Sequence, residues 1–230
     1  MALQKKYSIL GIIGCLCFGI GDWLLGYADP ALMEEADLYF IRAGHGMGYN
    51  TLRVDVTLVL AVLGIFFLYP GFVHIADIAK DGKTKRILRY AFGLCPTGWM
   101  MLHLYVSFLV LAFSEAERAG GHETAMILAG RFCSAGAAVE KCTSLFAVGA
   151  GIVLIIAILR GNTWLKKSAI VFSPVIPMLM IIAIAQALPQ SAFSYGLYTF
   201  NMNAAMMVWF VYLLAVGSKT AIEGGGIKRI

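Results

Sequence analysis

The chain has 230 residues, of which 60% are hydrophobic and 13% charged, and its formal net charge is +5. Soluble domains carry about 25% charged residues, so this composition excludes a chain that covers itself with polar surface in water. The mean hydropathy of +0.80 indicates an integral membrane protein.

Long apolar stretches follow one another along the whole chain. A stretch of about 20 residues in a helix, at about 1.5 Å per residue, crosses the roughly 30 Å of hydrocarbon in a bilayer. Alternating segments of the β-barrel type are absent, and helices are then the remaining way to satisfy every backbone group in lipid. We predict an all-α bundle and a single domain of six spans, at 8–28, 56–79, 87–113, 137–159, 168–188 and 193–217.

Basic residues gather in alternate loops, and this pattern predicts the orientation. Short cytoplasmic loops collect Lys and Arg. The basic residues before the first span and after the second, fourth and sixth spans fall on one side: Lys5, Lys6, Lys80, Lys83, Lys85, Arg86, Arg160, Lys166, Lys167, Lys219, Lys228 and Arg229. We therefore expect a multi-pass protein of the cell membrane with both termini in the cytoplasm. The net charge reflects this topology, so no nucleic-acid partner is expected.

The first apolar run also resembles a secretory signal, but we expect it to be retained as a helix. The outer loop between the first two spans contains Arg42 and His45, and we expect it to cap the outer face of the bundle and to contribute ligand-binding side chains.

Two cysteines lie near the outer start of the fourth span. Cys133 and Cys142 would face an oxidising compartment there, and the sequence predicts a disulfide between them. No cysteines are spaced as CxxC, and no ligand set indicates a metal, so neither a metal nor a cofactor is predicted.

Polar residues at membrane depth carry the functional prediction. Such residues are costly in hydrocarbon and usually face the bundle interior or a water-filled cavity. Asp22, His103, Ser107, Asn201 and Asn203 all lie roughly 10 to 16 Å from the outer ends of their spans. One cavity open to the outer side could hold them all.

Two further residues are expected nearer the outer surface. Glu140 and Tyr198 would line the mouth of this cavity. At the opposite end, His74 and Asp77 are three residues apart and are predicted to form an interfacial pair beside the basic loop. They lie too far in depth from His103 to share a metal ion with it.

Asp22 and His103 allow three interpretations. They could be a hydrogen-bonded pair that only holds two helices together. An Asp that orients a His is also what a general base requires, and Ser107, one helical turn away, could be a nucleophile or a substrate anchor. The same groups could instead bind a proton or a polar ligand in transit.

Three functions follow from these interpretations. A membrane-embedded enzyme that acts on a lipid or lipophilic substrate is the first, because the site lies at the depth of an outer-leaflet headgroup and upper acyl chain. A small-molecule or proton-coupled transporter is the second, and a non-catalytic ligand-binding protein is the third. Membrane lipids are the expected partners, and self-association stays open.

One set of residues carries a resemblance to a family of proteins. The set is Gly21, Asp22, Trp23, Leu24, Leu25, Gly26, Tyr27, Arg42, Gly44, Gly48, Tyr69, Pro70, Gly71, Phe72, His74 and His103. It resembles a domain-of-unknown-function family of small bacterial multi-span proteins, and the resemblance implies that Asp22, Arg42, His74 and His103 are features of that family. The Gly-Asp-x-Leu-Leu motif is also similar to one in lysoplasmalogenase-type hydrolases. Their other acidic positions find no match here, so their activity is not carried over.

Overall fold

The computed structural model describes residues 2–26 and 51–223, and the predicted all-α class is confirmed for that part of the chain. The α-helices are α1 (Ala2–Gly26), α3 (Thr51–Ile75), α4 (Gly82–Gly120), α5 (His122–Leu159), α6 (Val175–Ala187) and α7 (Ala192–Glu223). Two short 3-10 helices, η2 (Ala76–Ile78) and η3 (Lys167–Phe172), lie at the ends of α3 and α6.

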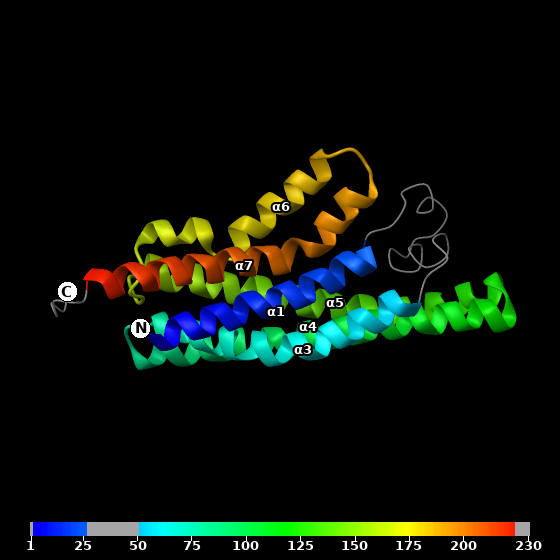
Figure 1. Cartoon of the computed structure of the whole chain (residues 1–230), viewed down its shortest axis with the longest axis horizontal. Coiled ribbons are helices and arrows are strands. Elements are labelled where there is room, and N and C mark those ends of the chain that lie inside the picture. Colours follow the sequence, from blue (N-terminus) through cyan, green and yellow to red (C-terminus); the bar gives the residue numbers. More distant parts are fainter. Residues whose placement is uncertain (1, 27–50, 224–230) are drawn as a thin grey trace.

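Five of the helices are long and apolar enough to cross a membrane. The segments concerned are Lys5–Leu25, Leu52–Ile78, Gly82–Gly120, Lys141–Leu159 and Ala192–Val216. These helices run along the long axis of the molecule, and the start of α1 and the end of α7 lie at the same end of the bundle (Figure 1). With α6 included, successive helices run in opposite directions along this axis (Figure 1).

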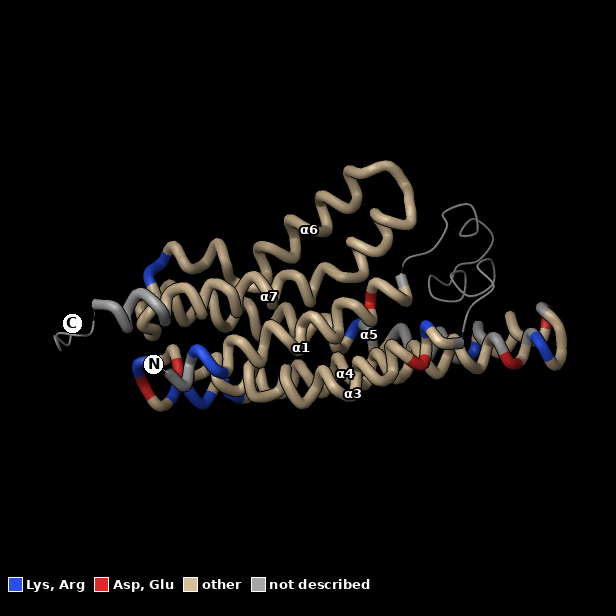
Figure 2. Tube along the Cα trace, in the orientation of Figure 1, with Lys and Arg blue, Asp and Glu red and all other residues tan. Residues whose placement is uncertain are grey.

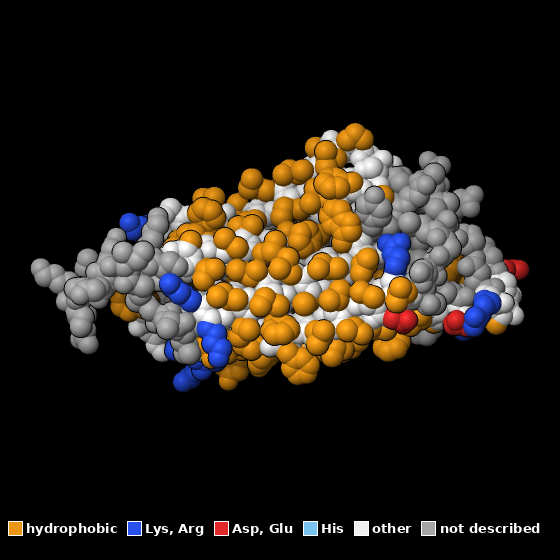
Figure 3. Space-filling view, viewed as in Figure 1, with side chains coloured by type: hydrophobic (Ala, Val, Ile, Leu, Met, Phe, Trp, Pro, Cys, Tyr) orange, Lys and Arg blue, Asp and Glu red, His pale blue; other side chains and the backbone are white. Residues whose placement is uncertain are grey.

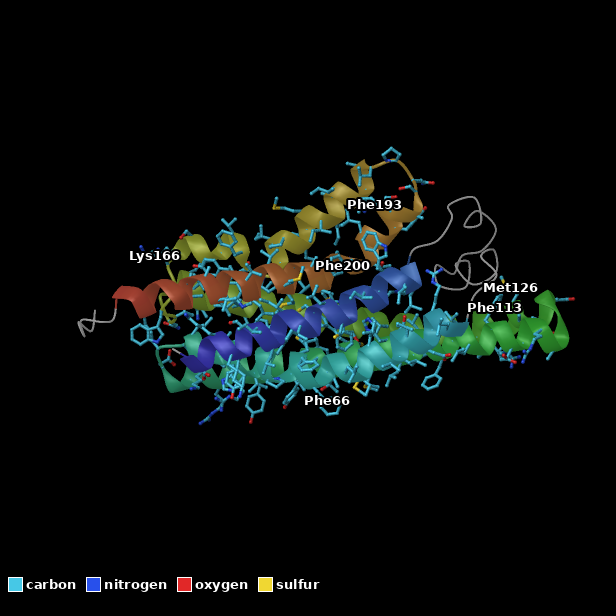
Figure 4. All side chains as sticks on the ribbon, in the orientation of Figure 1. Phe66, Phe113, Met126, Lys166, Phe193 and Phe200 are labelled. Carbon is cyan, nitrogen blue, oxygen red and sulfur yellow. The ribbon has the colours of Figure 1, made fainter. Side chains whose placement is uncertain are left out.

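The surface is that of a protein surrounded by lipid. Hydrophobic side chains cover the middle of the face shown in Figure 3, and Lys and Arg lie toward its two ends. Phe66 and Leu145 each expose 71% of their surface, and Phe66 points away from the bundle (Figure 4). Figure 2 shows many of the Lys and Arg residues at the end of the bundle that holds the start of α1.

The predicted span 168–188 is not one continuous helix. Its first part is η3, and α6 has only 13 residues, a length of about 20 Å. The break falls at Ser173, whose backbone is extended (ψ 147°), directly before Pro174. The proline ring disfavours a helical conformation in the residue before it, which explains the break. In Figure 1, α6 inclines away from the other helices.

The predicted loop at 114–136 is also helical. α4 continues to Gly120 and α5 begins at His122, so the two helices form a hairpin that extends past the rest of the bundle (Figure 1). The turn is a single residue, Gly121, with φ of +82°. Glycine adopts this left-handed conformation at little cost, and a side chain there would strain the turn.

Small residues let α1 approach α3 closely. A Cβ on Gly71 would come within 2.8 Å of the Cα of Gly11, and one on Gly14 would come within 2.6 Å of the amide nitrogen of Leu68. These are contacts between backbones, which only glycine allows, and small residues are what helix pairs in membranes use to pack closely. This packing fixes the height of α1 in the bundle.

The two connections at the other end of the bundle are joined by backbone hydrogen bonds. The Lys80 amide donates to the carbonyl of Asn162 at 2.9 Å, and the Trp164 amide donates to the carbonyl of Ile78 at 2.9 Å. The Lys80 ammonium also lies over the Trp164 ring, 5.4 Å from its centroid. The start of α4 is thereby tied to the segment that follows α5.

Candidate functional site

Three helices bring one carboxylate, one imidazole and one amide together inside the bundle. Asp22 Oδ1 on α1 lies 2.7 Å from His103 Nε2 on α4. Asn203 Nδ2 on α7 donates to the other oxygen, Oδ2, at 2.5 Å. The sequence singled out all three residues, and the prediction that Asp22 and His103 face each other is confirmed. We refer to Asp22, His103 and Asn203 as the polar cluster.

The polar cluster is almost sealed from the surroundings of the protein. Exposure is 7% for His103, 17% for Asp22 and 3% for Asn203. The edge of the Phe18 ring packs on the imidazole, with centroids 4.6 Å apart at 78°. On the other side, a Cβ on Gly21 would lie 3.2 Å from Thr57 Cγ2, so α3 also closes over the pair. Charge–charge contacts are strong in so apolar a setting.

The two nitrogens of His103 have different partners, and these decide where its protons are. Nδ1 lies 2.9 Å from the Trp99 carbonyl oxygen, which can only accept a hydrogen bond, so Nδ1 carries a hydrogen. Nε2 is in ion-pair range of Asp22, although this contact does not meet the angular criteria of a hydrogen bond. At 2.7 Å a proton must lie on one of the two groups, because two bare lone pairs would repel each other. The pair is either imidazolium with carboxylate or imidazole with carboxylic acid.

Ser107 is buried near this pair but is not bonded to it. Its side chain is fully buried, and its Oγ has no hydrogen-bond partner among the described residues. Asn203 Oδ1 is also buried and has no hydrogen-bond partner among the described residues. A nucleophilic serine needs a base in contact with its hydroxyl, and Ser107 has no such contact among the described residues.

The other predicted ligand-binding residues do not join the cluster. Tyr198 on α7 is 44% exposed, and Asn201 donates through its amide to the carbonyl of Tyr198. The α7 residue that does approach from this side is Thr199, whose hydroxyl donates to the Asp22 carbonyl at 3.3 Å. Sequence reasoning missed Thr199, although it lies four residues before Asn203 and hence on the same helix face.

Three predicted residues fall where their side chains are not described. Arg42 and His45 lie outside the described residues, and Glu140 is placed only as part of the α5 backbone. The structure gives them no position relative to the polar cluster.

The disulfide prediction is wrong. Cys133 and Cys142 lie nine residues apart in the continuous helix α5, which separates them by about 14 Å along its axis. A disulfide requires Cα atoms less than about 7 Å apart. Cys142 is accordingly a free, exposed cysteine. The error came from expecting a loop where α5 begins early.

The predicted interfacial pair at the other end of the bundle is confirmed. His74 Nδ1 and Asp77 Oδ2 are 2.5 Å apart, and Lys85 Nζ lies 2.7 Å from the other carboxylate oxygen. Tyr7 stacks on the His74 ring, with centroids 3.4 Å apart at 7°. These contacts join the start of α1 to the ends of α3 and α4, which is a structural role.

The polar cavity expected at the cluster is not shown. A pocket that the described residues form against Trp99, one helical turn from His103, is apolar. Nor does the described part of the chain hold any group of three His, Cys, Asp or Glu residues that could bind a metal ion.

Helices of this length and composition, with an ionisable pair at membrane depth, define a multi-span membrane protein. The chain belongs to a family of unknown function, DUF6796, whose model matches residues 1–220. The match covers nearly the whole chain and extends well beyond residues 21–103, which carried the resemblance. No curated protein and no solved structure matches the chain, and nothing supports the likeness to lysoplasmalogenases.

Proposed function

We propose that the chain crosses the membrane six times with both termini in the cytoplasm, and that Asp22 and His103 bind a proton that is coupled to transport across the bilayer. The sixth crossing is η3 together with α6. Six residues of 3-10 helix and 13 residues of α-helix span about 12 Å and about 20 Å, which together match the roughly 30 Å hydrocarbon core. The basic loops on one side support this orientation.

The observation that carries the proton-binding proposal is the assignment of protons in the polar cluster. Because the Trp99 carbonyl occupies Nδ1–H, the short contact between His103 Nε2 and Asp22 Oδ1 requires one further proton. The Asn203 amide holds the second carboxylate oxygen and so fixes Asp22 toward the ring. The pair with its proton is neutral overall.

Removal of that proton would leave a net negative charge in an apolar interior. Such a charge is costly in the membrane, so the helices that bury it would rearrange or admit water. The rearranged state would then release the proton to the other side, and a transported ligand that favours this state would link its own passage to that of the proton. The polar cluster joins α1, α4 and α7, and these are the elements expected to move.

The lipid-acting enzyme suggested by the sequence stays a prediction. A hydrolytic role for Ser107 needs a base in contact with its hydroxyl. His103 Nδ1 is bonded to the Trp99 carbonyl and Nε2 lies 2.7 Å from Asp22 Oδ1, whereas Ser107 Oγ has no hydrogen-bond partner among the described residues. Proton binding requires no such change in the cluster.

Reconstituted protein tests the carrier role. Liposomes that contain a pH-sensitive dye would report proton entry when a potassium diffusion potential is imposed. We expect the wild-type protein to conduct more protons than protein-free liposomes, and Asp22→Asn to return the flux to that baseline. The matched control is Asp55→Asn, which removes an exposed carboxylate from α3 and should leave the flux unchanged. A wild-type flux at the baseline, or an unaltered flux in folded Asp22→Asn, would contradict the carrier role.

A further inference from the structure

An apolar pocket lies inside the bundle on the side where α6 leaves it. The pocket is small and partly open to the outside, and its walls come from α3, α4, α5, α6 and α7 together with Pro174. Every residue that lines it is apolar. Polar solutes are therefore poor occupants, and hydrocarbon is the solvent that surrounds the protein at this depth.

The exposure of the walls shows where the pocket opens. Phe92, Cys95 and Trp99 on α4 are buried, whereas Ala147 on α5 and Met178 on α6 are partly exposed. The mouth therefore lies between α5 and α6, on the side that faces lipid. Exposed apolar side chains occur on both helices near it, among them Leu145 on α5 and Leu179 and Met180 on α6.

α5 and α6 meet closely at one point between this mouth and the end of the bundle where η3 begins. A Cβ on Gly151 would clash with the Val175 side chain, so the two chains touch there. Beyond that point α6 inclines away and stays attached to the bundle through α7 (Figure 1). Ala147 and Met178, which line the pocket, lie beyond this contact on α5 and α6.

Two lysines stand at the membrane surface on the same side. The side chains of Lys166 and Lys167 are exposed. Figure 4 shows Lys166 at the end of the bundle where η3 begins. η3 then runs for about 12 Å before the chain reaches Pro174 at the pocket. The spacing matches a phospholipid, with its phosphate at the surface and its chain carbons deeper in the bilayer.

We propose that this pocket receives a segment of one acyl chain of an anionic phospholipid whose phosphate is bound by Lys166 and Lys167. The lipid would enter between α5 and α6 from the leaflet on the lysine side. The site is separate from the polar cluster, and the proposal does not depend on proton transport. Its chemistry is hydrocarbon contact in the pocket and charge attraction at the mouth.

Quenching of tryptophan fluorescence by brominated acyl chains tests the pocket. The chain has four tryptophans, so Trp99 can be left as the only one by Phe substitutions, and a second variant can keep only Trp209. Both are nearly fully buried, at 3% and 0% exposure, but only Trp99 lines the pocket. We expect brominated phosphatidylglycerol to quench Trp99 strongly and Trp209 weakly. Equal quenching of the two would overturn the proposal.

Matched substitutions on α5 separate the pocket from general lipid contact. Ala147→Phe fills the mouth and should protect Trp99, whereas Leu145→Phe adds a ring on the lipid face and should not. If Ala147→Phe left the quenching of folded protein unchanged, the pocket would not be the entry route.

The headgroup is tested by placing the bromine on one lipid of a mixture. In vesicles of phosphatidylglycerol and phosphatidylcholine, the anionic lipid should quench Trp99 more when it carries the bromine. Lys166→Gln with Lys167→Gln should lower this preference by roughly fivefold for each charge removed. Lys83→Gln with Arg86→Gln removes the same charge from the start of α4 and should not. Native mass spectrometry of the same variants should show the same order of retained lipid. An equal preference in the wild type would overturn the assignment to these lysines.

Discussion

Replacement of Asp22 alone or of His103 alone by leucine should strongly destabilise the protein. Replacement of both should cost much less than the sum of the two single losses. The two side chains are 17% and 7% exposed and 2.7 Å apart, so neither leucine variant leaves its partner in water. Removal of one member of a buried ion pair costs about 3 to 5 kcal/mol, because the other charge stays unpaired. We expect a loss of this size for Asp22→Leu and for His103→Leu.

The double variant is expected to behave differently. With both groups gone, the remaining loss comes from the Asn203 amide, which donates to Asp22 in the wild type and would become unpaired. An unsatisfied buried donor costs about 1 to 3 kcal/mol. The loss of unfolding free energy in the double variant should therefore be smaller than the sum of the two single losses by about 3 kcal/mol or more. A coupling of this size is within the range for contacting residues when charge is involved.

Reversible unfolding in mixed micelles would supply the four free energies of the cycle. Asn201→Leu serves as the control on α7, because Asn201 lies two residues from Asn203 and bonds only to the Tyr198 carbonyl among the described contacts. Its cost should be about 1 kcal/mol or less. Additive losses for Asp22→Leu and His103→Leu would refute the paired arrangement on which the site depends.

Three further predictions concern packing, thiols and pH. Gly71→Ala should destabilise the protein by about 1 to 3 kcal/mol, because its Cβ would meet the backbone of α1 at 2.8 Å, whereas Gly149→Ala meets nothing within 4 Å and should cost nothing in the same unfolding assay. Alkylation of the unreduced protein, followed by mass spectrometry, should modify Cys142, and a peptide cross-linked through it would contradict the helix. Hydrogen bonds from the Thr84 amide and hydroxyl lower the pKa of Asp81. The Asp81 carboxylate therefore stabilises the start of α4 above about pH 4, and this stabilisation is lost as the pH falls through the lowered pKa. Amide exchange at Thr84 should then lose its protection in acid, and equal protection in Asp81→Ala at neutral pH would argue against this cap.

The sequence was sufficient to predict the part of the site that depends on membrane depth. Asp22 and His103 lie at similar depths in neighbouring helices, and a carboxylate and an imidazole in lipid need each other or water, so their contact could be predicted. Asn203 was predicted for the same reason. Its neighbour Asn201 was not distinguished from it, because depth alone does not tell which face of α7 meets α1.

The features that the sequence did not predict depend on local backbone geometry and packing. The loss of helix at Ser173 follows from Pro174, but the inclined course of α6 depends on how the chain packs on α7. The long loop expected between α4 and α5 is a turn of one glycine, Gly121. α5 therefore begins early, and Cys142 lies in a continuous helix where it cannot reach Cys133 to form a disulfide. The apolar pocket at Trp99 was invisible, because a void between helices has no residue pattern.

Nitrogen-15 NMR of histidine-labelled protein in bilayers tests the central claim most directly. The chain has four histidines, and His103→Gln would identify the signals of His103 by their loss. We predict a hydrogen on Nδ1, held by the Trp99 carbonyl, and an Nε2 that shares a proton with Asp22 and becomes a bare, neutral nitrogen in Asp22→Asn. A neutral ring with its hydrogen on Nε2 and a bare Nδ1, unchanged by Asp22→Asn, would contradict the account.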